Sequence, residues 1–265
     1  MNRRPPAWVF AMAAVPALLL GVPICALMWR LPWSNLGEAL SSDAATSALV
    51  LSLVTSLIAT ALCVVFGLPL AWALASGKGT TTRIVRALCL LPIVLPPVVG
   101  GVALLLAFGR QGIVGQRLAA VGLQLPFTTA GVVLAQTFVA LPFFVLSVEA
   151  ALRQLDVEYA DVAIVHGASP FRAFVSVTLP SVGPAVLAGA VLAWARALGE
   201  FGATVTFAGS LEGRTQTLPL AVYDLLERDP ADAVVLSAVL VVVAVAVLVG
   251  LRDRWFGIFG SDVER

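Results

Sequence analysis

Six apolar runs, each long enough to cross a membrane as a helix, constrain this chain of 265 residues more than any other feature. A helix of about 20 apolar residues spans the hydrocarbon core of a bilayer. The predicted spans cover residues 7–29, 46–75, 87–109, 130–148, 182–207 and 233–251. The sequence therefore predicts an all-α, polytopic membrane protein with six transmembrane helices in a single domain, residues 1–265.

The composition excludes a soluble domain. Only 12% of the residues are charged, whereas about a quarter are charged in soluble domains, and the mean hydropathy is +1.01. Cys25, Cys63 and Cys89 lie in apolar runs and lack the spacing of paired or metal-binding cysteines. We expect a chain that contacts membrane lipid and uses no metal, no cofactor and no nucleic acid.

The basic residues predict that both termini are cytoplasmic. Six spans put the termini on the same side as the loops 76–86 and 152–181. Cytoplasmic loops carry an excess of Lys and Arg. The side with the termini holds ten such residues, Arg3, Arg4, Lys78, Arg83, Arg86, Arg153, Arg172, Arg252, Arg254 and Arg265. The opposite side holds five, Arg30, Arg110, Arg117, Arg214 and Arg228.

The loop between the fourth and fifth spans contains EYADVAIVHGASPFRAFVSVTLP, residues 158–180, and its pattern is amphipathic. A short helix is predicted from Val157 to Val165, and Gly167 suits the left-handed residue that often follows a helix. Ser169 is a good N-cap, and Pro170 fits the first turn of a second helix. We expect Pro180 to interrupt that second helix before the fifth span.

The charge of this loop favours a protein partner over the lipid surface. Helices that lie on a membrane are usually basic on their polar face. The first predicted helix instead carries Asp156, Glu158 and Asp161 beside a single Arg153. An anionic cytoplasmic leaflet would repel these carboxylates.

The same loop resembles the cytoplasmic loop of ABC importer permeases. That family shows the pattern E-A-A-x3-G-x9-I-x-L-P, and this chain has Asp161-Val162-Ala163, then Gly167, Val177 and Leu179-Pro180 at the same spacing. Asp replaces Glu, and Val replaces both the first Ala and the Ile. The resemblance implies an ABC transporter type-1 transmembrane domain, whose loop docks on a separate cytoplasmic ATPase. The coupling residues that it implies, with neighbours chosen from the turn pattern, are Asp161, Ala163, His166, Gly167, Ser169, Pro170, Leu179 and Pro180. His166 is either an ATPase contact or a surface histidine with no such role.

The chain itself lacks the motif for ATP hydrolysis. A phosphate-binding loop requires G-x-x-x-x-G-K-S/T, but Trp72 stands at the first glycine position and Gly79 follows Lys78, the only lysine. No span carries a nucleophile beside a base or a metal cluster. We therefore expect a transport subunit and not an enzyme.

The fifth span carries two ionisable residues, Arg196 and Glu200, which are four residues apart and so share a helix face. Charged groups at membrane depth usually face a cavity or a partner. They either neutralise each other, or Arg196 meets an anion that Glu200 restrains. The small or hydroxyl residues Gly202, Thr204 and Thr206 follow. In the third span, Pro96 and Pro97 predict a kink that either lines the pathway or serves packing.

Two stretches narrow the resemblance to the molybdate-type permeases of the sulfate/molybdate branch. They are ARALGEFGATVTFAG, ending at Gly209, and RTQTLPLAVY, residues 214–223. The resemblance implies a bacterial cell membrane protein that forms a permease homodimer with an ATPase dimer and an extracytoplasmic oxyanion-binding protein. Sulfate, tungstate or another oxyanion is the alternative cargo. A secondary transporter is the alternative class, and it would show inverted repeats or paired ionisable groups near mid-membrane.

Overall fold

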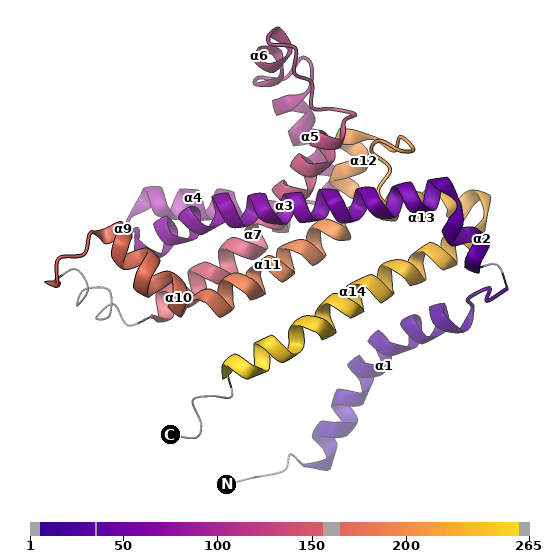
Figure 1. Cartoon of the computed structure of the whole chain (residues 1–265), viewed down its shortest axis with the longest axis horizontal. Coiled ribbons are helices and arrows are strands. Elements are labelled where there is room, and N and C mark those ends of the chain that lie inside the picture. Colours follow the sequence, from indigo (N-terminus) through magenta and orange to yellow (C-terminus); the bar gives the residue numbers. More distant parts are fainter. Residues whose placement is uncertain (1–5, 35, 156–164, 260–265) are drawn as a thin grey trace.

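The computed structural model describes residues 6–34, 36–155 and 165–259, and the secondary structure within them is helical throughout (Figure 1). This confirms the predicted all-α class. The α-helices are α1 Ala7–Trp29, α2 Leu36–Ser41, α3 Asp43–Ser76, α4 Thr80–Val94, α5 Pro97–Phe108, α6 Gly115–Ala120, α7 Thr129–Gln154, α9 Pro170–Ala173, α10 Leu179–Ser181, α11 Gly183–Leu198, α12 Gly202–Ala208, α13 Leu218–Arg228 and α14 Pro230–Phe259. A π-helical turn, Phe174–Thr178, separates α9 from α10.

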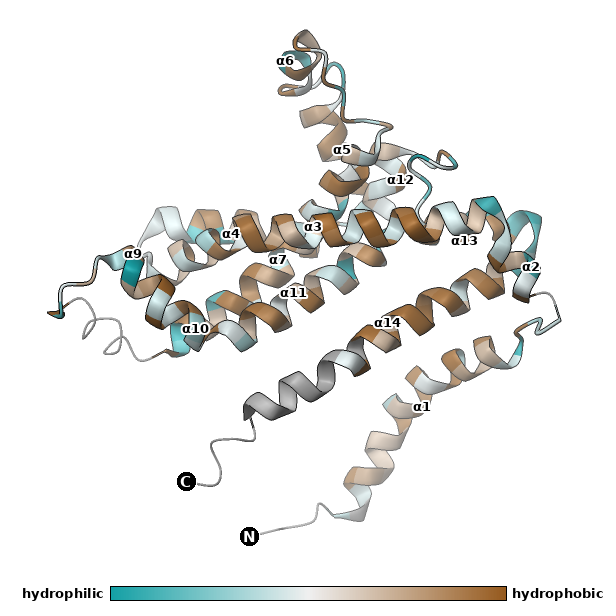
Figure 2. Cartoon of the chain, in the orientation of Figure 1, coloured by the Kyte–Doolittle hydropathy of each residue, from teal (hydrophilic) through white to brown (hydrophobic). Residues whose placement is uncertain are grey.

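Four helices are long and apolar enough to cross a membrane by themselves: α1, α3, α7 and α14. They correspond to the first, second, fourth and sixth predicted spans. The segment Pro170–Ser181 together with α11 makes a fifth candidate, bent by 72°. Figure 2 shows apolar residues along the long helices and hydrophilic residues near α9–α10 and near α2–α13.

The third and fifth predicted spans are not continuous helices, as we had expected for residues 87–109 and 182–207. The third is divided between α4 and α5, because Pro96 and Pro97 supply no N–H donors and force Leu95 into an extended conformation. The fifth is divided between α11 and α12 by residues 199–201. The structure therefore has a complete break where the sequence predicted a kink at Pro96 and Pro97, and a second break where it predicted a continuous fifth helix.

Small residues form the centre of the bundle, where α3, α7 and α11 pack together. Ala59, Cys63, Ala140 and Ala193 are fully buried there. A Cβ at Gly67 would lie 2.6 Å from Cδ1 of Phe144, and one at Gly189 would lie 3.2 Å from the Phe144 carbonyl oxygen. Small side chains let membrane helices approach closely. The resulting van der Waals contacts stabilise helix association, because the hydrophobic effect does not drive helices together within lipid.

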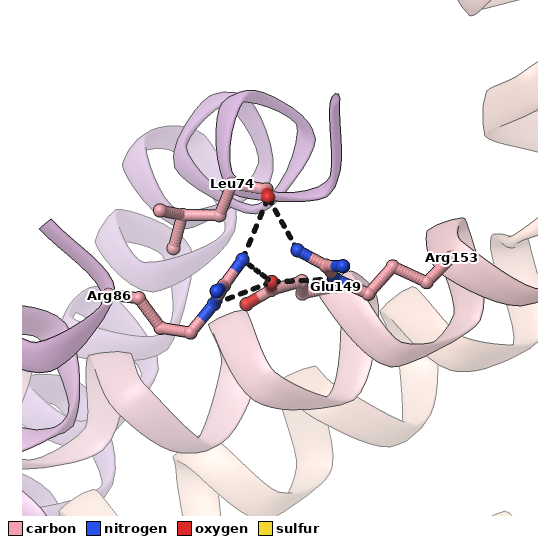
Figure 3. Close-up of polar contacts among 4 residues, drawn as sticks. All are labelled: Leu74, Arg86, Glu149 and Arg153. Carbon is pink, nitrogen blue, oxygen red and sulfur yellow. Dashed lines mark hydrogen bonds and ion pairs between the residues drawn. The ribbon is translucent and has the colours of Figure 1, made fainter. Parts of the chain in front are cut away.

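A charge cluster, Arg86, Glu149 and Arg153, ties the ends of α3, α4 and α7 together (Figure 3). Oε1 of Glu149 accepts from Nε of Arg86 at 2.9 Å and from Nε of Arg153 at 2.9 Å. Both guanidinium groups also donate to the Leu74 carbonyl oxygen, at 3.0 and 2.9 Å. Leu74 lies in the last turn of α3, where carbonyls have no partner within the helix. One carboxylate and one carbonyl thus hold two arginines between three helices.

We predict that Glu149→Gln destabilises the protein. Glu149 is 4% exposed, and its loss would leave two guanidinium groups facing each other. Breaking a fully buried pair costs about 3–5 kcal/mol, but the Arg153 side chain is 45% exposed, so we expect about 1–3 kcal/mol. Thermal unfolding of the detergent-purified protein measures this. Glu38→Gln on α2 is the matched control, because Glu38 is exposed and forms no ion pair with any described residue. An unchanged melting temperature for Glu149→Gln would contradict the prediction.

Candidate functional site

The turn predicted at GASP is present. Gly167 has a φ of +91°, in the left-handed region that favours glycine. Oγ of Ser169 accepts from the Arg172 N–H at 3.3 Å, and Pro170 begins α9. Asp161 and Ala163 lie outside the described residues, as does all of the predicted first helix except Val165. The local sequence rules for a cap and a turn are therefore confirmed between Gly167 and Pro170.

Pro180 does not interrupt the second helix, contrary to our expectation. The helical segment passes through Leu179 and Pro180 and ends at Ser181. A proline in an α-helix clashes with the carbonyl four residues earlier and leaves it without a donor. Here the π turn widens the backbone first, and the Leu179 N–H donates to the Phe174 carbonyl, five residues back. The wider turn accommodates the proline ring, and the chain bends only at Val182.

The segment 165–181, which we call the coupling segment, has one packed face and one exposed face. Phe174 is buried and stacks on Trp72 of α3, with ring centroids 4.0 Å apart. Phe171 is 70% exposed, and Val175 is also exposed. His166 and Ser169 are exposed as well. The segment is thus anchored on α3 close to Leu74, and it presents an apolar surface away from the bundle.

The break between α11 and α12 contains a buried ion pair. Glu200 is 1% exposed, and its Oε2 lies 2.5 Å from the Arg196 guanidinium. Oε1 of Glu200 accepts from the Ala203 N–H at 2.8 Å, at the start of α12. Glu200 lies beyond the end of α11, so the two residues do not share one helix as we had assumed. Of the two predicted roles, the structure shows mutual neutralisation.

The two broken segments meet, because α5 packs against α12. A Cβ at Gly202 would lie 2.7 Å from Cβ of Pro97, and one at Gly101 would lie 2.6 Å from Cβ of Thr206. Pro96 occupies the cap position of α5. The structure therefore brings Pro97 next to Gly202 and Gly101 next to Thr206, which the sequence could only place in separate spans.

The hydroxyl groups of the predicted pathway differ in their bonding. Thr206 Oγ1 donates to the Gly202 carbonyl at 2.8 Å, within its own helix. Thr204 is fully buried, and its hydroxyl has no hydrogen-bond partner among the described residues. Only Thr204 of the two therefore holds an unused hydroxyl in this conformation.

Sequence reasoning missed three groups of polar residues. They are the cluster around Glu149, the buried Gln136 of α7, and a network in which Oδ2 of Asp224 accepts from Ser210 at 2.9 Å and Gln216 at 2.7 Å. The four-residue spacing of Glu149 and Arg153 was a usable signal. Gln136 was also visible, as a lone amide inside the predicted span 130–148. In the last network, Gln216 lies in the RTQTLPLAVY stretch and Asp224 directly follows that stretch. From the sequence, this stretch indicated only a resemblance to a family.

Comparison with known proteins identifies the family of this chain. Residues 64–264 match the family described as the binding-protein-dependent transport system inner membrane component. The molybdenum transport system permease protein ModB of Mycobacterium tuberculosis (strain ATCC 25618 / H37Rv) is 47% identical over 249 residues, 94% of each chain. The sulfate transport system permease protein CysT of Escherichia coli (strain K12) is 32% identical over 228 residues, 84% of this chain and 82% of CysT.

A solved structure shares the fold. It is a bacterial alginate ABC transporter in complex with an alginate pentasaccharide-bound periplasmic protein, and it superposes with a TM-score of 0.68 at 16% identity, covering 91% of each chain. The apolar helices agree with a multi-pass protein of the inner membrane, and the relatives are transport components rather than enzymes. The chain belongs to the family of inner membrane components of binding-protein-dependent transport systems.

Proposed function

We propose that this chain is the membrane-spanning permease subunit of an ATP-driven molybdate importer. The observation that carries the proposal is the 47% identity, over 94% of both chains, to the mycobacterial molybdenum permease. Identity to the sulfate permease is lower, at 32%, so sulfate is the second candidate. Tungstate is proposed as a co-substrate on its chemical likeness to molybdate alone. Family membership removes the secondary transporter that the sequence left as an alternative class.

The chemistry of the broken segments supports an oxyanion cargo. The pathway that we propose follows Pro96, Pro97, Arg196, Glu200, Gly202, Thr204 and Thr206. Arg196 and Glu200 neutralise each other there, so no bare carboxylate repels an anion. Neutral donors and small residues let a hydrated anion pass without holding it so tightly that release fails. A cation pathway would instead be lined by unpaired acidic groups.

The molybdoenzyme activity and growth of a deletion strain test which anion the protein transports. In a deletion strain grown with scarce molybdate and abundant sulfate, we expect molybdoenzyme activity to be lost and added molybdate to restore it. The same strain should grow normally with sulfate as its sulfur source. A sulfur requirement with intact molybdoenzyme activity would move the assignment to sulfate.

The coupling segment is the proposed contact with the ATPase. The exposed Phe171 and Val175 present an apolar surface of the kind that a partner covers. On the opposite face, Phe174 stacks on Trp72, and Trp72 lies two residues before Leu74, which the charge cluster holds. Closure of an ATPase dimer would therefore act on α3, and through Arg86, Glu149 and Arg153 on α4 and α7. We assign ATPase docking to Asp161, Ala163 and His166 as well, on the resemblance alone.

We predict that Gly167→Val abolishes transport while the protein still inserts into the membrane. Space is not the obstacle, because a Cβ at Gly167 would meet nothing within 4 Å. The obstacle is the φ of +91°, which costs a β-branched residue about 1–3 kcal/mol and so reorients the docking surface. Gly167→Asn is the matched control, because Asn adopts positive φ more readily, and it should retain more uptake. Membrane content, ATPase copurification and uptake are measured together, and normal uptake by the Val variant would refute the coupling role.

The proposed assembly is a permease homodimer with both termini in the cytoplasm, joined by two ATPase copies and an extracytoplasmic binding protein. The ten-to-five distribution of basic residues supports this orientation. The alginate transporter that shares the fold was solved with its periplasmic protein bound, and the family description itself names dependence on a binding protein. The native mass of the purified complex gives the number of copies.

Cysteine labelling tests the orientation. In a chain whose three native cysteines are replaced by alanine, we expect Glu212→Cys to react with an impermeant thiol reagent in intact cells. Lys78→Cys should react only after the membrane is permeabilised. Both residues are exposed in the folded chain, so access to the compartment decides the result. Labelling of position 78 from outside would invert the topology.

A further inference from the structure

Gln136 is a buried amide that the fold does not use. It lies on α7, one of the membrane-spanning helices, and it has no exposed surface. Neither Nε2 nor Oε1 has a hydrogen-bond partner among the residues that the structure describes. Burying an amide without a hydrogen bond destabilises a folded protein. An apolar residue of the same length would therefore stabilise this site better than glutamine does.

The packing of α7 against α11 and α12 places Gln136 beside the break between those two helices. A Cβ at Gly189 would contact Phe144, whereas a Cβ at Gly131 would contact the ring of Phe207 at 3.4 Å. The two chain segments thus run antiparallel. Gln136 lies between residues 131 and 144, and the matching part of the partner segment, between residues 189 and 207, has Arg196 and Glu200 near its middle.

The helical face of Gln136 agrees with this position. Residues three before and four after it, Val133 and Ala140, share its face of α7. Both belong to the apolar cluster that contains Ala193 and Ala197, in the last two turns of α11. Gln136 therefore lies on the face of α7 that packs against α3 and the last turns of α11, which precede the break.

A second unused polar group lies on the other side of the same break. The Thr204 hydroxyl of α12 is fully buried and has no partner among the described residues. Arg196 and Glu200, the charged residues described at this break, are paired with each other. The break is thus flanked by two neutral groups that carry N–H and O–H donors, and these donors are free to bind an acceptor.

We propose that the Gln136 carboxamide is a binding group for a tetrahedral oxyanion in transit, reached when the break between α11 and α12 moves away from α7. This inference rests on the proposed function as an oxyanion permease. An oxyanion presents acceptors only, so it is held by the Nε2 hydrogens and the Thr204 hydroxyl without a net charge that would trap it. A purely structural amide would be bonded within the fold, and Gln136 is not.

Three variants of the reconstituted complex, with its ATPase and binding protein in lipid vesicles, test the proposal. Gln136→Met keeps the length and removes the hydrogen bonds, and Gln136→Glu adds a negative charge. Thr137→Val is the matched control, because the neighbouring Thr137 hydroxyl already donates to the Val133 carbonyl at 2.7 Å. Initial rates of molybdate uptake, ATP hydrolysis and the melting temperature are measured for each.

We expect Gln136→Met to raise the melting temperature and to lower the maximal uptake rate about tenfold, the effect of losing one charge-assisted hydrogen bond. The half-saturating molybdate concentration should not change, because the binding protein sets it. Gln136→Glu should transport less than Gln136→Met, and Thr137→Val should match the wild type. Wild-type uptake by Gln136→Met, or a loss of uptake with a lowered melting temperature, would overturn the proposal. If the wild type carried sulfate and not molybdate, the cargo assignment would fail, and the same variants measured with sulfate would decide the role of Gln136.

Discussion

The bilayer forces each backbone N–H and carbonyl within it to find a partner in the protein, and this constraint shapes the chain. Continuous helices meet it in α1, α3, α7 and α14. The two broken segments pack against each other, with Gly202 close to Pro97 and Gly101 close to Thr206. At the second break, the Glu200 carboxylate accepts the Ala203 N–H that the interrupted helix leaves unbonded. The two breaks thus lie side by side within the protein, and a pathway can be lined by polar groups where membrane helices are interrupted.

Two buried carboxylates, Glu149 and Glu200, hold different parts of the helix bundle together. Glu149 joins α3, α4 and α7 through two arginines and the Leu74 carbonyl. Glu200 instead joins the end of α11 to the start of α12, and its only arginine is Arg196. Removing one partner of a buried pair leaves an uncompensated charge, so both sites resist separation. The first cluster fixes helices to one another, and the second fixes the two halves of a broken segment.

Local rules in the sequence predicted local structure well and distant contacts poorly. Hydropathy located the long helices, and the cap and turn preferences of Gly167, Ser169 and Pro170 gave the correct backbone. The kink predicted at Pro96 and Pro97 is a complete break between α4 and α5, and the break at residues 199–201 was not predicted, because hydropathy counts apolar residues and does not register where a helix stops. The stacking of Trp72 on Phe174, and the pairing of Arg86 with Glu149, join residues far apart in the chain. A single sequence does not reveal which distant residues will meet. The individual residues could therefore be identified from the sequence, but their contacts could not.

The helix α7 carries two of the buried polar groups, one near each of its ends. Near its end it carries Glu149, beside the helix on which the coupling segment is anchored. About two turns after its start it carries Gln136, level with the break between α11 and α12. A rigid element that has two arrangements can transmit motion between two sites. A position between the sites does not by itself show that an element does so. A displacement of α3, α4 and α7 as one body would move Gln136 relative to Glu200 and would leave the ion pairs of Glu149 and of Glu200 intact. Gln136 has no hydrogen bond to any described residue, so such a motion breaks none at this site, and an anion that bonds to the carboxamide in the displaced state would stabilise that state.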